Sequence, residues 1–225
     1  WQPWLWVGGI LGGFSLTKFA KTENATKASF QNYILVKKVH RISGLLLIFG
    51  FIGLHIFNHA AALISTEKHE ELRLLFRSWY AGDLIEPIMF VLLIMMGLTG
   101  IPMVKRYMRS NTDIYKTLQI GSGIYMVFFL CAHVNAVLSA RSRAVETDWI
   151  FATGENGLID GYFFLIPYYI LSVGMIWIHA SAGVRMILLA NKMEMTQANN
   201  IFKILAVTGL ITTLLVGGVL LGVQL

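Results

Sequence analysis

Apolar stretches without a single charged residue recur along the chain, separated by short charged segments. Each stretch approaches or exceeds the roughly 18–20 residues that a helix needs to cross a bilayer. Because backbone polar groups inside a bilayer must bond within their own segment, these stretches are expected to be helical. The pattern predicts an all-α membrane protein with five transmembrane helices, at residues 42–66, 87–104, 117–140, 161–184 and 204–225.

The segment before the first span is expected to differ from the rest. Residues 1–17 carry no charge, but they lack the basic lead-in and the small-residue cleavage site of a signal peptide. We expect an N-terminal interfacial helix in residues 1–28 that lies on the membrane surface. Residues 29–225 would then form the five-helix transmembrane domain.

Composition agrees with a membrane protein and narrows its function. Of the 225 residues, 56% are hydrophobic and 13% are charged, with a mean hydropathy of +0.65, whereas soluble domains are about a quarter charged. The sequence contains no phosphate-binding glycine loop, nucleophile–base pair or zinc-ligand spacing, so nucleotide-binding and hydrolase functions have no support. A single cysteine and the absence of a CxxCH motif argue against covalently attached haem.

The charges between the spans predict an orientation. Segments on the side where the first span begins carry 13 Lys and Arg and 3 acidic residues, whereas those on the other side carry 5 and 9. Because basic residues mark the cytoplasmic side, we expect the first span to begin inside and the C-terminus to lie outside. The basic inner face could dock a soluble partner or bind anionic lipid head groups.

Three of the six histidines lie deep within spans, one each in the first, third and fourth. A polar side chain in hydrocarbon is costly and is a functional-site hypothesis by default. A neutral imidazole also requires partners for both nitrogens, and the alternative to a ligand role is a satisfied hydrogen bond between helices. The three are His55, His133 and His179. His69 lies in a polar segment and is expected to be solvated, and His40 lies at the inner membrane edge.

Two of these histidines are expected to lie at the same depth in the membrane. His55 lies ten residues before Ser65, about 15 Å at 1.5 Å per residue, and His133 lies eight residues before Arg141, about 12 Å. Their spans run in the same direction, so the two imidazoles can face each other at one level. Two imidazoles on neighbouring helices can hold a haem iron from both sides.

His179 belongs to the other half of the membrane, where a second site would require a partner from the second span. That span has no histidine, but it contains Met95 and Met96. Methionine can ligate haem iron, although in a membrane helix it is more often packing. Near the outer surface, His59 is a candidate for an alternative ligand or for hydrogen bonding to a quinone carbonyl, and Glu86 is a candidate for handling protons of a quinol. The alternatives are a capped helix edge for His59 and a helix-start charge for Glu86.

Three motifs resemble one known family. They are "KKVHRISGLLLIFGFIGLHIFNH" at 37–59, "LQIGSGIYMVFFLCAH" at 118–133 and "IHASAGVRMILL" at 178–189. In this order they are similar to the cytochrome b membrane anchor of the succinate dehydrogenase and fumarate reductase family, the succinate:quinone oxidoreductases. The likeness is to the single-chain, five-helix, dihaem type, and it covers most of residues 37–190.

The resemblance implies haem b as cofactor, quinone as substrate, and soluble iron–sulfur and flavoprotein subunits as partners on the inner face. The membrane would be the bacterial cytoplasmic or the mitochondrial inner membrane. The implied haem ligands are His55, His133 and His179, and the positions that would hold haem propionates or quinone are His40, Arg41 and Ser43.

The second span departs from the family pattern. The family has a histidine four residues before a glycine there, and this chain has Met96 before Gly100. We therefore expect a single haem. The alternatives, in decreasing order of preference, are an inner haem held by His179 and Met96 and a five-coordinate inner haem on His179. Two other functions stay open: a haem-b, quinone-sensing anchor of a signalling protein such as a cyclase, and a haem-free structural anchor.

Overall fold

The computed structural model describes residues 27–108, 113–154, 158–159 and 161–224, with the side chains described from residue 32 onward. The predicted interfacial helix at 1–28 falls almost wholly outside the described residues. Throughout the described part the regular secondary structure is helical, and five helices are long and apolar enough to cross a membrane. The prediction of an all-α protein with five candidate spans is confirmed.

The first span is one continuous rod made of α2 (Lys27–Leu47), a π-helical segment η1 (Ile48–Ile52) and α3 (Gly53–Ala61). The other spans are α5, α6, α8 and α9, and the short 3-10 helix η2 (Phe163–Leu165) leads into α8. Their bounds are Ile85–Tyr107, Ile114–Ser142, Ile166–Ala190 and Met195–Leu220. Two shorter helices, α4 (Thr66–Tyr80) and α7 (Trp149–Thr153), lie between spans.

The helices extend beyond the charge-free stretches that predicted them. The first begins at Lys27 rather than near residue 42, and the last begins at Met195 rather than near 204. Charged residues mark where a helix leaves hydrocarbon, but they do not interrupt its backbone bonds. The first span also ends early, at Ala61, because Ser65 caps the next helix by accepting a hydrogen bond from the Lys68 amide at 3.1 Å.

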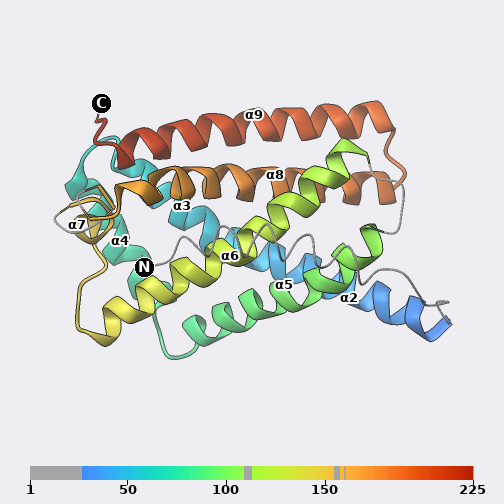
Figure 1. The fold of residues 1–225 in the computed structure, drawn as a ribbon, viewed down its shortest axis with the longest axis horizontal. Coiled ribbons are helices and arrows are strands. Elements are labelled where there is room, and N and C mark those ends of the chain that lie inside the picture. The colour runs from blue at the N-terminus through green and yellow to red at the C-terminus, as the bar shows by residue number, and fades with distance from the viewer. Residues whose placement is uncertain (1–26, 109–112, 155–157, 160, 225) are drawn as a thin grey trace.

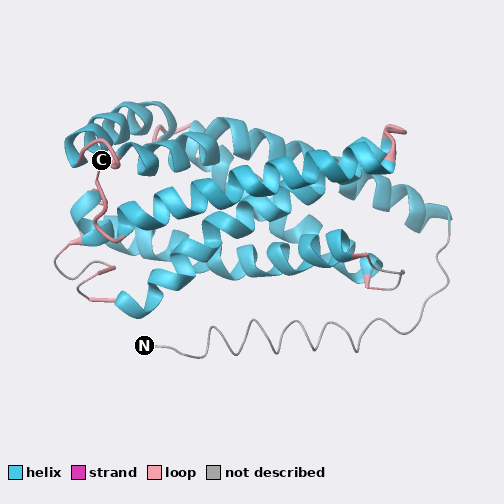
Figure 2. Ribbon diagram, turned by 90° about the horizontal axis from the view of Figure 1, so that it is seen from above, coloured by secondary structure: helices cyan, strands magenta, loops and turns pink. Residues whose placement is uncertain are grey.

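The five spans run side by side along the long axis of the molecule (Figures 1 and 2). Close backbone packing joins α8 with α9, α6 with α8, and α2 with α5, whereas α2 and α3 approach α6 only sparsely. The outward surface is apolar, with Phe49, Ile94 and Leu214 among the exposed side chains. That surface suits a lipid environment.

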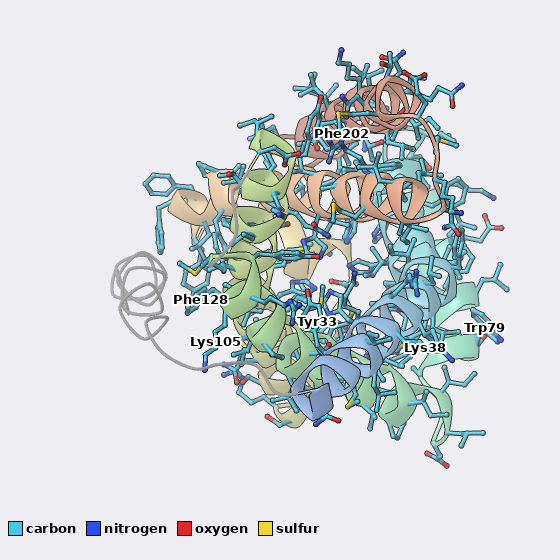
Figure 3. All side chains as sticks on the ribbon, turned by 90° about the vertical axis from the view of Figure 1, so that its right-hand side faces the viewer. Tyr33, Lys38, Trp79, Lys105, Phe128 and Phe202 are labelled. Carbon is cyan, nitrogen blue, oxygen red and sulfur yellow. The ribbon has the colours of Figure 1, made fainter. Side chains whose placement is uncertain are left out.

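The two ends of the bundle differ in charge. At one end α2 begins, α5 and α8 end, and α6 and α9 begin; we call it the basic end, and Figure 3 looks onto it with Lys38 and Lys105 labelled. At the opposite, acidic end α4 and α7 cover the bundle (Figure 1). This division follows the charge asymmetry seen in the sequence.

The π-helical segment η1 lies between His40 and His55, two of the three histidines of the first span. A β-carbon added at Gly53 would lie 2.9 Å from the Ile48 carbonyl oxygen, so the wide turn requires a glycine there. Wide π turns change the rotation between the helical segments on either side. Both histidines consequently reach rings on α6 or α8.

Candidate functional site

The structure brings together the two histidines that depth had paired. The ring centroids of His55 on α3 and His133 on α6 lie 6.0 Å apart, with an angle of 64° between the ring planes. Neither ring makes a hydrogen bond within the described part of the chain. Both are enclosed by the bundle, yet each keeps a partly accessible surface.

Each of these rings is held by a phenylalanine one helical turn earlier. Phe51 stacks on His55 with centroids 5.2 Å apart and planes 22° apart, and Phe129 stacks on His133 at 5.4 Å and 13°. The sequences are FIGLH and FLCAH, so the same Phe-x-x-x-His spacing occurs on both helices. Residues i and i+4 share a helix face, and the stacking fixes both imidazole planes. Sequence reasoning missed this pair, although the shared spacing was visible.

A polar cluster extends from His55 towards the acidic end. His59 lies 4.7 Å from His55 and 5.5 Å from His69 between ring centroids, and His69 lies 4.7 Å from Trp149. The Asn58 side-chain amide bonds His69 Nε2 at 3.1 Å. Three buried atoms of the cluster have no partner in the described chain: Asn58 Oδ1, His59 Nδ1 and His69 Nδ1.

The prediction that His69 is solvated is wrong. His69 is only 2% exposed, because α4 folds back over α3 and places this histidine between α3 and α7. Burial is the largest cause of a lowered His69 pKa; Arg73 adds to it, while Glu70 and Asp148 oppose it. The Glu70 carboxylate accepts from Arg73 Nε at 2.7 Å, and this hydrogen bond lowers the pKa of Glu70.

The basic half of the bundle contains a second histidine pair. His40 on α2 and His179 on α8 lie with ring centroids 6.1 Å apart and planes 65° apart. His40 Nδ1 lies 2.9 Å from Thr99 Oγ1 on α5, and His179 Nδ1 lies 3.0 Å from the Gln119 carbonyl oxygen on α6. His40 therefore points into the bundle, beyond its expected place at the membrane edge.

The other predicted site residues of the basic half are Met96, Ser43 and Arg41, and they differ in burial and in their contacts. The Met96 thioether packs against Gly44, where an added β-carbon would lie 3.4 Å from its terminal methyl. Ser43 is buried, whereas Arg41 is exposed and has no ion-pair or hydrogen-bond partner among the described residues.

The side chain of Arg185, in the third sequence motif, contacts three neighbouring residues. Its Nε donates to Asn199 Oδ1 at 2.7 Å, its Nη2 lies 3.2 Å from the Asp113 carboxylate, and the guanidinium stacks on Tyr115. This buried arginine ties together α8, α9 and the start of α6. Its contacts are structural ones within the described chain.

An open pocket of about 590 Å³ lies at the acidic end, between the start of α5 and the end of α6. Its lining includes Pro87, Phe90 and Leu138 together with the Glu86–Arg141 ion pair. It combines apolar walls with three charged side chains, Asp83 and the Glu86–Arg141 pair. The predicted candidate Glu86 therefore lines a cavity.

Aromatic contacts run from near this pocket to the paired histidines. Tyr80, the last residue of α4, meets the Phe51 ring at 5.0 Å, and Phe51 stacks on His55. Tyr80 adjoins Ala81, which lines the pocket. The pocket and the His55–His133 pair therefore belong to one half of the bundle.

The histidine pairs can be tested against haem by their spacing. A metal–imidazole bond is about 2 Å long, and the ring centroid lies about 1 Å beyond the bonded nitrogen. Two axial imidazoles on one iron thus have centroids about 6 Å apart, in agreement with 6.0 Å for His55–His133. Within the described residues no three His, Cys, Asp or Glu side chains surround a common point where a metal ion could sit. The facing imidazoles of His55 and His133 are therefore the candidate ligand pair among these residues.

Comparisons of the chain with protein-family models, with curated proteins and with solved structures gave no match. The fold and the site define a helical protein with five candidate membrane spans and facing histidines in its interior.

Proposed function

We propose that this chain is the membrane-anchor cytochrome b subunit of a succinate:quinone oxidoreductase, either a succinate dehydrogenase or a fumarate reductase. The observation that carries the proposal is the facing pair of His55 and His133, with rings 6.0 Å apart inside the bundle. Five apolar helices and the three family-like motifs support it.

Haem b, when bound, supplies a one-electron carrier inside the membrane. His55 and His133 would hold its iron, and Phe51 and Phe129 would fix the planes of these ligands through stacking. Tyr169 on α8, whose ring lies 5.9 Å from that of His133, would close one side of the site. The chain itself would not contact the dicarboxylate.

The acidic-end pocket is a candidate quinone site. Phe90 and Leu138 offer apolar walls for a quinone ring, and the Glu86 carboxylate lies where it could exchange a proton with a quinol oxygen. Its ion pair with Arg141 holds the carboxylate at the pocket wall. Protons and electrons would then be handled in the same half of the bundle.

The basic end is the proposed docking face for the iron–sulfur and flavoprotein subunits. Its excess of lysine and arginine supports placing it inside, in a bacterial cytoplasmic or mitochondrial inner membrane. Exposed Arg41 on this side is available to a partner or to anionic lipid.

The test is haem b per chain in purified full-length protein, measured as pyridine haemochrome. We expect His55→Ala and His133→Ala each to lose one haem. His59→Ala, one turn further along the same helix, is the matched control and should retain it. Wild-type protein without haem, after expression with an adequate haem supply, would rule out the electron-transfer function and leave a haem-free anchor.

A second experiment separates a respiratory anchor from a sensor. The tagged chain is isolated in mild detergent from its native membrane, and its partners are identified. We expect flavoprotein and iron–sulfur subunits, and succinate should reduce the haem of the complex. Recovery of a cyclase or kinase instead would favour the sensing function.

A further inference from the structure

The short helix α4 has two different faces. The side that packs against the bundle carries four residues at helical spacing, which are His69, Arg73, Phe76 and Tyr80. The opposite side, which we call the exposed face of α4, carries six exposed residues, which are Glu67, Glu71, Leu74, Leu75, Ser78 and Trp79. Packing within the chain therefore uses one face of α4 and leaves the other open.

The exposed face changes character halfway along the helix. Its first two residues, Glu67 and Glu71, are acidic, whereas its last four include three large apolar side chains. Leu74, Leu75 and Trp79 are 55%, 60% and 54% exposed. A helix face in water normally carries polar side chains, and adjoining exposed apolar residues mark a contact surface. The C-terminal half of this face is therefore expected to contact an apolar partner.

Two polar side chains in this half of α4 are already bonded within the protein. The Ser78 hydroxyl donates to the Leu75 carbonyl oxygen at 2.7 Å. Arg77, the single charged residue between Leu74 and Tyr80, reaches the Glu146 carboxylate at 3.5 Å. Because a polar group is costly in apolar surroundings unless it is bonded, these contacts allow this half of the helix to enter such surroundings.

The apolar half of α4 lies between two outward surfaces of the spans. On one side, Phe76 meets the exposed Phe57 ring of the first span, with centroids 6.4 Å apart. On the other side, the chain continues through exposed Leu84 and Ile88 into α5. Figure 3, which looks along the bundle, shows Trp79 at its periphery. The apolar residues of the exposed face are therefore continuous with the apolar outward surface of the spans.

We propose that the C-terminal half of α4 is a membrane contact, in which Leu74, Leu75 and Trp79 insert among phospholipids at the acidic end of the bundle. The acidic half of the same face stays in water. Amphipathic helices bind membranes by burying an apolar face at the boundary between head groups and acyl chains, where tryptophan is enriched. Continuity with the outward surface of the spans favours lipid over a protein partner. The contact holds the end of α4 where Tyr80 meets Phe51, and it does not depend on a bound haem or quinone.

Spin labels on single cysteines test this contact in the purified full chain, reconstituted into phosphatidylcholine vesicles. Leu75→Cys and its matched control Glu71→Cys, one turn earlier on the same face, are made in a Cys131→Ser background. Saturation EPR compares collisions with oxygen, which concentrates in lipid, and with a water-soluble nickel chelate. We expect the ratio of oxygen to nickel accessibility to be several-fold higher at residue 75 than at residue 71. It should approach the ratio for a label on native Cys131, which is exposed within α6.

Two results would overturn the proposal. Equal nickel accessibility at residues 75 and 71 would place the whole face in water. Low accessibility to both reagents at residue 75 would show that a protein, such as a second copy of this chain, covers the face.

A milder substitution repeats the test without a label. The tryptophan fluorescence that is lost in Trp79→Phe should be quenched by brominated phospholipid in the vesicles and protected from iodide in the water. Quenching of that component by iodide and not by the brominated lipid would contradict the membrane contact.

Discussion

The side-chain amide of Asn58 on α3 lies 3.1 Å from Nε2 of His69 on α4, and both side chains are almost completely buried. Since the amide nitrogen donates, His69 accepts at Nε2 and carries its proton on Nδ1. This contact ties the short helix α4 to the first span. It also lies directly beyond His55 and His59, so it closes the acidic end over the His55–His133 pair.

Asn58→Leu is expected to destabilise the protein by about 1–3 kcal/mol, because it leaves a buried imidazole nitrogen without its donor. The measurement is the midpoint of thermal unfolding in detergent, followed by circular dichroism. Glu71→Ala is the control: it removes only the exposed Lys68–Glu71 ion pair, which contributes about 0–1 kcal/mol. Equal effects of the two variants would contradict the role of Asn58.

Stability is expected to fall as the pH drops below about 6.5, the usual pKa of histidine. Burial lowers the pKa of folded His69, so in this range the unfolded chain binds a proton that the folded chain does not. His69→Asn should flatten this part of the profile relative to wild type. Unfolding midpoints measured between about pH 8 and pH 5 for both proteins provide the test, and parallel profiles would exclude His69 as the source.

Gly123→Ala is expected to disturb His179. The added β-carbon would lie 3.0 Å from His179 Cε1 and 3.2 Å from Nδ1, so the ring must move away from the Gln119 carbonyl. We expect the midpoint of thermal unfolding to fall, because the displaced ring loses a buried hydrogen bond, which contributes about 0.5–1.5 kcal/mol. Gly121→Ala, two residues earlier on α6 with nothing within 4 Å, should match wild type. An unchanged unfolding midpoint in Gly123→Ala would show that the ring tolerates the shift.

Gly209→Ala is expected to weaken the packing of α9 on α8. Its β-carbon would lie 2.3 Å from Trp177 Cβ, an atom that cannot move without its backbone. Overpacking of this kind costs about 1–3 kcal/mol, which should appear as a lower unfolding midpoint. In the control Gly97→Ala, nothing lies within 4 Å, and the variant should be neutral or gain about 0.5–1 kcal/mol from the lost flexibility of glycine.

The sequence alone predicted the five helices and the shared level of His55 and His133. Both follow from local rules: hydrocarbon excludes charges from a stretch of fixed length, and a helix rises by a fixed amount per residue. Counting from the membrane edge therefore sufficed to place His55 opposite His133. The sequence could not give the ends of the helices, because a helical backbone continues through the charged residues at which the chain leaves the membrane.

Tertiary structure alone decided which rings meet across helices. His40 contacts His179 and His69 is buried beneath α4, because the rotation of each helix about its axis is set by packing with distant segments. The π turn at Ile48–Ile52 and the fold of α4 over α3 illustrate this dependence. The pattern of residues within one span does not show which ring of a second span faces it. The shared level of His55 and His133 could thus be read from the sequence, whereas the burial of His69 and the contact of His40 with His179 could not.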